Sequence, residues 1–321
     1  MIVARTPLRV PFAGGLTDLA PYAQRFGGAT VSATIDAYVR VSLLPSLDGR
    51  FEVHAEGAVE HAAEPEEVGH ELAREALASV DRAQLPVRMA IWADLPGNSG
   101  LGTSGAVTVS LLHALRAARG ETPSRAALAE EAAEIEVERL RGASGYHDAH
   151  VCARGGVLRL TYDGAKVRER RLDADPTTTR ELERSLLLFA TERQERTKPS
   201  LDALTARFEE AVPILHDIRA LADEATAAIE SGDVARLAFC IGEQQRLKQL
   251  LPGRFVDDQV RDVTARVRAV GAAAQFPGGK ISGFVLVCCP EGQHEAVREA
   301  LPELRQLPLR FSHERSVVVR G

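Results

Sequence analysis

Apolar and polar positions repeat with two different periods along this chain. A period of two, with many Val, Ile, Thr and aromatic residues, indicates β-strands. Segments with this pattern or with a short unbroken apolar run are 2–12, 28–43, 51–56, 87–96, 185–192, 281–289 and 309–319. Residues 155–172 are expected to form a hairpin that turns at Asp163-Gly164. A period of 3.6 indicates helices, in segments 66–80, 107–115, 123–140, 199–230, 233–250 and 256–270. Because strands and helices mix without strict alternation, we expect an α+β fold.

Prolines and turn residues set several expected boundaries in this pattern. Pro7 and Pro11 are expected to break the first strand, since proline cannot donate to a sheet ladder. The turn residues at 46–50 predict a β-hairpin between the strands on either side. Thr122 is expected to cap the next helix, with Pro123 in its first turn.

Length and composition narrow the class of protein. The 321 residues are enough for two domains, and a boundary near residue 183 would separate a glycine-rich half, 1–183, from a helix-rich half, 184–321. A net charge of −6 without a Lys/Arg block argues against a nucleic-acid partner. No signal-peptide pattern and no membrane-length apolar run occur, so we expect a cytoplasmic protein that does not bind membranes. The four cysteines lack CxxC spacing, which favours buried reduced thiols.

The strongest chemical signal is a glycine-rich loop between a strand and a helix, at residues 95–106. Glycines allow the backbone to approach a ligand closely, and the N–H groups of a helix start favour an anion. The hydroxyls of Thr103 and Ser104 suit a phosphate oxygen or Mg²⁺. The alternative is a turn that only starts a helix. The candidate phosphate-binding residues are Pro96, Gly97, Asn98, Ser99, Gly100, Leu101, Gly102, Thr103 and Ser104.

The same loop matches G-x-G-x-x-G literally through Gly100, Gly102 and Gly105. A dinucleotide site would also need a strand ending in an acid about 20 residues later. Glu121 has that spacing but lies in a turn between two helices, so an NAD-dependent oxidoreductase is disfavoured. A P-loop is excluded, because no Lys follows the last glycine.

Residues 96–106 resemble the second motif of the GHMP kinases, P-x-x-x-G-L-G-S-S-A-A, with Thr103 for Ser and Gly105 for Ala. Residues 5–18 resemble the first motif, in the version P-L-R-x-x-F-A-G-G-G-T-D. That version is typical of kinases that phosphorylate D-glycero-D-manno-heptose 7-phosphate at C1. Without this resemblance, Arg9 and Asp18 beside a Gly-Gly turn would more often be a surface salt bridge.

The resemblance implies roles for individual residues. Asp18 would hold sugar hydroxyls, and Arg9 would lie near the reacting oxygen and the transferring phosphate. Residues 144–156 match the run G-G-K-Q-D-Q-Y-A-A-A-x-G-G in length, which places Asp148 on the catalytic aspartate. Asp148 would then be the base and Arg9 the charge stabiliser. The other acceptor-binding candidates in the first motif are Gly14, Gly15 and Thr17.

One glutamate on the helix before Asp148 stands apart from its neighbours. Glu134 and Glu138 fall on a solvated row, whereas Glu136 shares the row of Leu128 and Leu140. A carboxylate on an apolar row is costly unless something pairs with it, and a metal ion would serve. We therefore expect Glu136, with the Ser104 hydroxyl, to bind Mg²⁺; the alternative is a slight drift of the helix face.

Two C-terminal segments complete the resemblance. Residues 278–284 are similar to the third motif, G-A-G-G-G-G-F, although Lys280 and Ile281 replace small residues. Gly279 and Lys280 are candidate substrate contacts there. Arg193 lies in a basic segment that either binds a distal phosphate of the substrate or is a solvated turn.

The resemblance to the GHMP kinases implies a two-domain fold, with a ribosomal protein S5 domain 2-like N-terminal domain and a ferredoxin-like C-terminal domain. It implies an ATP- and Mg²⁺-dependent sugar kinase acting on the C1 hydroxyl of a heptose 7-phosphate or octose 8-phosphate in nucleotide-sugar biosynthesis. We expect a monomer or homodimer. The alternatives are a GHMP kinase for another acceptor, such as a free sugar, and a non-catalytic nucleotide- or sugar-binding relative.

Overall fold

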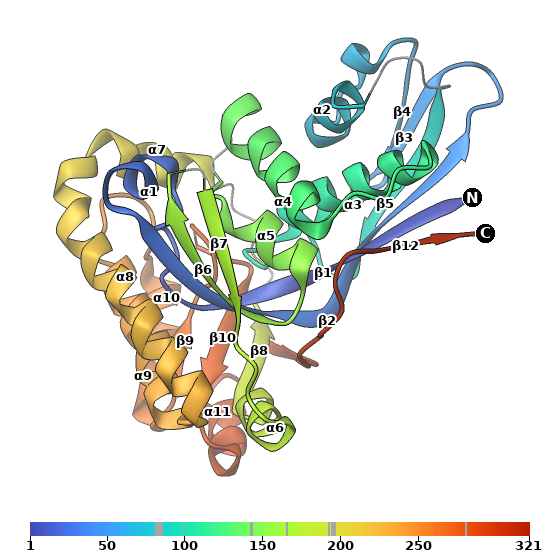
Figure 1. Cartoon of the computed structure of the whole chain (residues 1–321). Coiled ribbons are helices and arrows are strands. Elements are labelled where there is room, and N and C mark those ends of the chain that lie inside the picture. Colours follow the sequence, from blue (N-terminus) through green and yellow to red (C-terminus); the bar gives the residue numbers. More distant parts are fainter. Residues whose placement is uncertain are drawn as a thin grey trace.

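The computed structural model describes residues 1–80, 86–97, 99–141, 144–164, 166–191, 193, 197–279 and 281–321. Two β-sheets and the helices packed on them form this part of the chain (Figure 1). The larger sheet contains β1 (Ile2–Ala13), β2 (Gly28–Pro45), β3 (Phe51–Ala55), β4 (Ala58–Ala62), β5 (Val87–Ala93), β6 (Val157–Asp163), β7 (Lys166–Arg171) and β12 (Val317–Arg320). The smaller sheet contains β8 (Leu186–Ala190), β9 (Ala273–Gln275), β10 (Phe284–Cys288) and β11 (Arg305–Leu307).

The helices alternate irregularly with these strands, which confirms the expected α+β class. They are α1 (Ala20–Phe26), α2 (Glu71–Ala78), α3 (Thr103–Ala118), α4 (Arg125–Ala133), α5 (His147–Arg154), α6 (Pro176–Arg184), α7 (Lys198–Ala206), α8 (Phe208–Ser231), α9 (Val234–Lys248), α10 (Asp258–Ala269) and α11 (His294–Ala300). A π-helical turn, Glu134–Arg139, extends α4. Single 3₁₀ turns occur at Pro65–Glu67 and Glu291–Gln293.

The first strand is continuous, so the predicted break at its prolines is wrong. β1 pairs antiparallel with β2 along its length, and the register shifts between Pro7 and Arg9 and again between Pro11 and Ala13. Each proline therefore lies at an irregularity of the ladder, where its missing N–H costs no regular hydrogen bond.

The predicted hairpin around residues 46–50 is also wrong. β3 does not pair with β2 directly, because β5 lies between them, antiparallel to β2 and parallel to β3. The return partner of β3 is β4. The turn residues do reverse the chain direction. However, β2 and β3 are separated in the sheet by β5, which follows about 35 residues later in the sequence.

Helix boundaries differ from expectation in two places. The cap of α4 is Ser124 rather than Thr122, because the Ser124 hydroxyl accepts a hydrogen bond from the N–H of Ala127 at 3.0 Å. The long helical pattern at 199–230 is divided at Arg207 into α7 and α8, and α8 continues through Pro213.

The C-terminal strand is shorter than predicted from residues 309–319. Only β12 forms a ladder there, antiparallel to β1, which brings the two termini side by side (Figure 1). The chain thus returns to its first sheet after building the second. The division into domains 1–183 and 184–321 stays a prediction.

The smaller sheet has a core on each face. Alternate residues of β8 and β10 point to opposite sides. Leu186, Leu188, Phe284, Leu286 and Cys288 join the main core, which continues through α8 and α9 to β1 and β2. Leu187, Phe189, Val285, Val287 and Cys289 join a second core with α10 and α11. A continuous apolar core therefore fixes α9 against both sheets.

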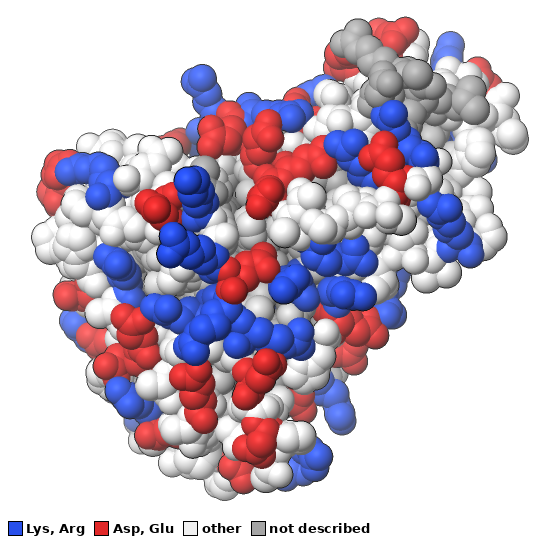
Figure 2. All heavy atoms as spheres, in the orientation of Figure 1, with Lys and Arg blue, Asp and Glu red and all other residues white. Residues whose placement is uncertain are grey.

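Charges on the surface are mostly mixed. Figure 2 shows Lys and Arg side chains gathered over β6 and β7, with acidic side chains between them. Two of these arginines tie the β6–β7 hairpin to α8: Arg159 pairs with Asp223, and Arg170 with Glu230 at 2.7 Å. The four cysteines are buried and free, as expected. Of the helices in the described residues, none has the length and apolarity needed to cross a bilayer.

Candidate active site

The candidate site is a cavity of about 150 Å³ between the two sheets. The first motif, the glycine-rich loop and the start of α5 line one side, and α7, α9 and the loop after β9 line the other. Predicted site residues that line it are Arg9, Gly15, Asp18, Ser99, Gly100, Gly102, Thr103, Ser104, Asp148 and Gly279. Segments more than 200 residues apart in sequence therefore share one cavity.

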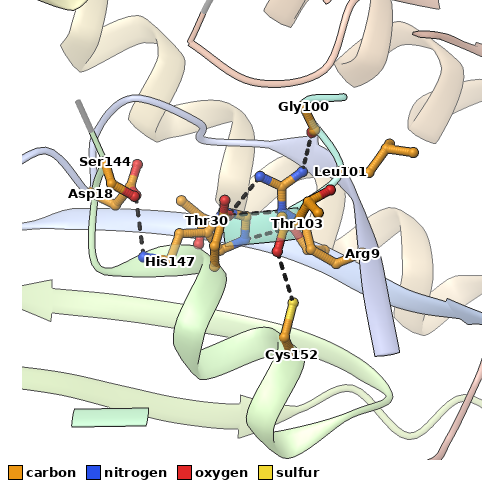
Figure 3. A network of polar contacts seen from close by, with 12 residues as sticks. Arg9, Asp18, Thr30, Gly100, Leu101, Thr103, Ser144, His147 and Cys152 are labelled. Atoms are coloured by element: carbon orange, nitrogen blue, oxygen red, sulfur yellow. Dashed lines mark hydrogen bonds and ion pairs between the residues drawn. The ribbon is translucent and has the colours of Figure 1, made fainter. Parts of the chain in front are cut away.

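The centre of the site is an ion pair between Arg9 and Asp148. Arg9 lies on β1 with only 4% of its surface exposed. Its Nε and Nη2 donate to Oδ1 of Asp148 at 2.9 and 2.6 Å, and its Nη1 donates to the carbonyl of Gly100 at 2.5 Å. Figure 3 shows the guanidinium pointing toward the glycine-rich loop. The arginine thus joins the predicted base to the predicted phosphate loop.

The Asp148 carboxylate is held in its charged form. Burial raises its pKa, but the positive charge of Arg9 and the hydrogen bonds from His147 and Arg9 outweigh this, so the pKa lies well below its usual value. The ring Nδ1 of His147 lies 3.3 Å from Oδ1 of Asp148. An anionic carboxylate in a partly desolvated cavity is a suitable proton acceptor once a hydroxyl group is placed beside it.

Asp18 lies close to this pair but in a different environment. The N–H of His147 donates to its Oδ2 at 3.2 Å. Burial, together with the nearby charge of Asp148, raises the pKa of Asp18. Gly145 is required beside it, because a Cβ at Gly145 would lie 1.9 Å from Oδ2 of Asp18. Two carboxylates with opposite pKa shifts therefore share the cavity, which suits separate binding and proton-transfer roles.

The glycine-rich loop has the geometry of an anion site. Gly100 and Gly102 have φ of +75° and +78°, which side chains rarely adopt, and Gly102 is the N-cap of α3. Helix geometry leaves the first N–H groups of α3 without partners inside the helix, and Gly102, Thr103 and Ser104 at this end line the cavity. The hydroxyls of Ser99 and Thr103 lie 2.9 Å apart. Backbone N–H groups and hydroxyls are thus arranged for oxyanions.

The departure from the family motif at Gly105 has a structural reason. A Cβ at this position would lie 2.8 Å from Cβ of Asp148 and from the backbone of Ala149. Real Cβ atoms essentially never approach this closely, so only glycine allows α5 to pack against α3 here. Gly105 therefore sets how close Asp148 lies to the phosphate loop.

Glu136 is buried, as its helical row predicted, with 5% of its surface exposed, while Glu134 and Glu138 are exposed. It lies on the π-helical turn that extends α4, and such turns are frequent at functional sites. Burial raises the pKa of Glu136 to about 7, although hydrogen bonds from Ser104, Thr108 and Ser144 act to lower it. Its carboxylate does not line the cavity but contacts Ser104, which does.

The third glycine segment packs directly on the phosphate loop. The Ser282 hydroxyl donates to the carbonyl of Ser99 at 2.5 Å. A Cβ at Gly100 would lie 2.3 Å from the carbonyl oxygen of Pro277. The two backbones can therefore pack this closely only because residue 100 is glycine. Ile281 points into the second core rather than the cavity. The substitution at 281 therefore leaves the contact between the two loops intact.

Several predicted site residues do not line the cavity. Thr17 and Gly14 fix the turn instead: the Thr17 hydroxyl donates to the Gly14 carbonyl at 2.7 Å. Leu101 is fully buried and accepts the backbone N–H of Arg9 at 2.9 Å. Arg193 is paired with Asp257, the N-cap of α10. Also off the cavity are Pro96 and Gly97. Asn98 and Lys280 lie outside the described residues.

Several cavity residues were not predicted as site residues, and four of them have side chains that can bind a polar ligand or position a site residue. His147 contacts both Asp18 and Asp148, and its Nε2 lies 2.7 Å from the Ser32 hydroxyl. The other three, Gln244, Lys248 and Gln275, come from the C-terminal half. Gln244 and Lys248 continue the apolar row of α9, the same signal that singled out Glu136.

Known proteins resemble this chain in sequence and in fold. Residues 69–156 match the GHMP kinases N terminal domain. The chain is 24% identical over 298 residues to the D-glycero-alpha-D-manno-heptose 7-phosphate kinase of Campylobacter jejuni subsp. jejuni, covering 88% of each protein. It resembles the crystal structure of a D-glycero-D-manno-heptose 1-phosphate kinase from Bacteroides thetaiotaomicron with a TM-score of 0.82 and 22% identity, over 100% of this chain and 99% of that one.

A solved structure of a third kinase shares this fold. Phosphomevalonate kinase of Streptococcus pneumoniae, solved with phosphomevalonate and AMPPNP, superimposes with a TM-score of 0.77 and 14% identity, over 97% of this chain and 100% of that one. The fold is thus that of small-molecule kinases. The resemblance to the GHMP kinases that the first two motifs predicted is thus confirmed, through the match of residues 69–156 to the N-terminal domain of that family.

Proposed function

We propose that this protein transfers the terminal phosphoryl group of ATP to the anomeric C1 hydroxyl of a heptose 7-phosphate or octose 8-phosphate. The observation that carries this proposal is the Arg9–Asp148 pair. It shares one cavity with the phosphate loop and with residues 14–18, the acceptor loop that ends at Asp18. The curated relative that aligns over most of the chain is named as a heptose 7-phosphate kinase, which supports the acceptor class.

In this proposal Asp148 accepts the proton of the C1 hydroxyl. Both Arg9 nitrogens that contact Asp148 bind Oδ1, so we assign the proton-accepting role to Oδ2. The hydroxyl oxygen then forms a bond to the terminal phosphorus, and the bond from that phosphorus to the bridging oxygen breaks to release ADP. Arg9 and the N–H groups at the start of α3 stabilise the charge on the transferring group, and Asp18 orients the sugar.

Magnesium fits the residues present. Ser104 and the buried Glu136 provide a hydroxyl and a carboxylate oxygen beside the phosphate loop, a donor set that Mg²⁺ prefers. No cluster of three or more His, Cys, Asp or Glu suited to a metal occurs in the described residues. The phosphates of ATP would supply the remaining oxygens. When bound, Mg²⁺ would neutralise phosphate charge.

Glu136→Gln should raise the Mg²⁺ concentration needed for half-maximal activity by about tenfold or more. Because burial raises the pKa of Glu136 to about 7, protons compete with the metal. In the wild type the requirement for Mg²⁺ should therefore grow as the pH falls below 7, and this growth should be weaker in the variant. Glu134→Gln, on the exposed side of the same turn, is the matched control. Identical Mg²⁺ titrations for all three proteins would exclude Glu136 as a ligand.

A panel of acceptors tests the proposed activity. The protein is incubated with MgATP and, in turn, heptose 7-phosphate, free heptose, other hexoses and their phosphates, and ADP release is followed. We expect ADP release with heptose 7-phosphate above the rate without acceptor. Better turnover of a free sugar would favour the other acceptor class. Tight ATP binding without turnover of any acceptor would indicate a non-catalytic relative, and binding of NADH rather than ATP would contradict a kinase.

A further inference from the structure

Lys248 has no role in the chemistry above, yet its side chain lines the cavity. It lies at the C-terminal end of α9, with only 3% of its surface exposed. Its Nζ donates to the carbonyls of Phe276 and Gly278 at 2.5 and 3.0 Å. Burying an ammonium group is costly unless it serves a specific interaction. Burial lowers the pKa of Lys248 to about 7, so an anion in the cavity would favour its charged form.

The face of α9 that bears Lys248 also organises the acceptor loop. Gln244 precedes Lys248 by one helical turn and therefore lies on the same face. Its Oε1 accepts the N–H of Gly14 at 2.9 Å, and its Nε2 donates to the carbonyl of Gly15 at 3.4 Å. This loop leads directly to Asp18. Lys248 thus lies between the loop that presents Asp18 and the third glycine segment.

The distribution of positive charge around the cavity suggests what Lys248 binds. Among the described residues that line it, the Lys and Arg side chains are Arg9 and Lys248. Arg9 is bonded to Asp148 and to Gly100, on the side of the phosphate loop and the α3 N-terminus. Those groups suit the phosphates of ATP. Lys248 comes from α9, whose Gln244 holds the backbone of Gly14 and Gly15.

We propose that Lys248 binds the phosphate group of the acceptor, the one remote from the reacting hydroxyl, and so determines the preference for a phosphorylated over a free sugar. This inference rests on the proposed kinase function. It also replaces Arg193 as the candidate for that role, because the Arg193 guanidinium is paired with Asp257 and does not line the cavity.

The test compares Lys248→Met and Lys248→Arg with the wild type on two acceptors, heptose 7-phosphate and free heptose. A hydrogen bond to a charged group contributes about 1.5–3 kcal/mol, which corresponds to about tenfold to a hundredfold in kcat/KM. We expect Lys248→Met to lose this factor with heptose 7-phosphate and to change little with free heptose. Lys248→Arg should retain part of the preference. Lys166→Met, at an exposed lysine of β7, is the matched control.

Two kinetic outcomes would overturn the inference. An equal loss with both acceptors would mean that Lys248 only holds the carbonyls of Phe276 and Gly278 in place. A rise in the KM for ATP, shared by both acceptors, would mean that the lysine binds a nucleotide phosphate instead. In both cases turnover by the wild type would leave the proposed kinase function standing.

A binding measurement keeps the inference testable without turnover. With MgADP present, heptose 7-phosphate should raise the thermal unfolding temperature of the wild type and of Lys166→Met, but not that of Lys248→Met. Equal stabilisation of Lys248→Met would refute the role of the lysine. If the wild type neither binds nor phosphorylates any sugar phosphate, the proposed function and the inference fail together.

Discussion

Asp148→Asn is expected to lower the rate of ADP release with the preferred acceptor by about a hundredfold to ten-thousandfold, the range of a general base. The amide has the shape of the carboxylate but cannot accept the hydroxyl proton. It also lacks the charge that pairs with Arg9. The loss should appear in kcat, measured under saturating MgATP, while ATP still binds, because the groups of the phosphate loop that would bind ATP are unchanged.

Asp163→Asn, at the exposed end of β6, is the matched control and should behave as the wild type. Thermal unfolding of both variants separates lost chemistry from lost folding, since Asp148→Asn removes one partner of a buried ion pair. A folded Asp148→Asn protein with more than a tenth of the wild-type rate would contradict the assignment of Asp148 as the base.

Arg9→Met is expected to have the second largest effect, a loss in kcat of about a hundredfold or more, as for removal of one preorganised donor to a developing charge. The guanidinium joins Asp148 to the Gly100 carbonyl, so both positioning and charge stabilisation are lost. Arg9→Lys retains the charge but not the forked geometry and should recover only part of the rate. Recovery of the full wild-type rate by Arg9→Lys would argue that charge alone matters.

The same variant should change the pH profile in a defined direction. Burial raises the pKa of Asp148, and the charge of Arg9 opposes it, together with His147. Without Arg9, less positive charge counteracts the effect of burial, so the pKa of Asp148 should increase. A protonated Asp148 cannot act as base, so the acid limb of kcat should move to higher pH in Arg9→Met. The other charged groups near Asp148, Asp18 and Glu136, are present in both proteins. An unshifted or lowered acid limb would contradict this electrostatic coupling.

The strands and the phosphate loop could be predicted because local chemistry determines them. β2, β5, β8 and β10 follow from apolar runs, and α3 follows from its apolar row. Strand pairing could not be predicted in the same way: β5 separates β2 from β3 through contacts between residues far apart in sequence. α5 was missed, because its eight residues are short and mostly polar at the start, and packing at Gly105 fixes it.

The site residues also fall into two groups, those that the sequence predicts and those that only the fold identifies. Arg9, Asp18 and Asp148 lie in segments whose glycine spacing is visible in the sequence, and the fold brings them together. Thr17 and Leu101 belong to the same segments but face inward, and only the backbone trace decides which side chains of a turn reach the cavity. Lys248 lies in no motif. Its one signal in the sequence is that a charged residue falls on the apolar row of α9, as Glu136 does on its own helix.

The position of the transferred phosphate tests the central claim most directly. After reaction of the wild-type protein with MgATP and heptose 7-phosphate, phosphorus NMR of the product should show a second phosphate coupled to the anomeric proton. One ADP should form for each product. Phosphate on any other hydroxyl, or ADP formation without a phosphorylated sugar, would contradict an anomeric sugar-phosphate kinase.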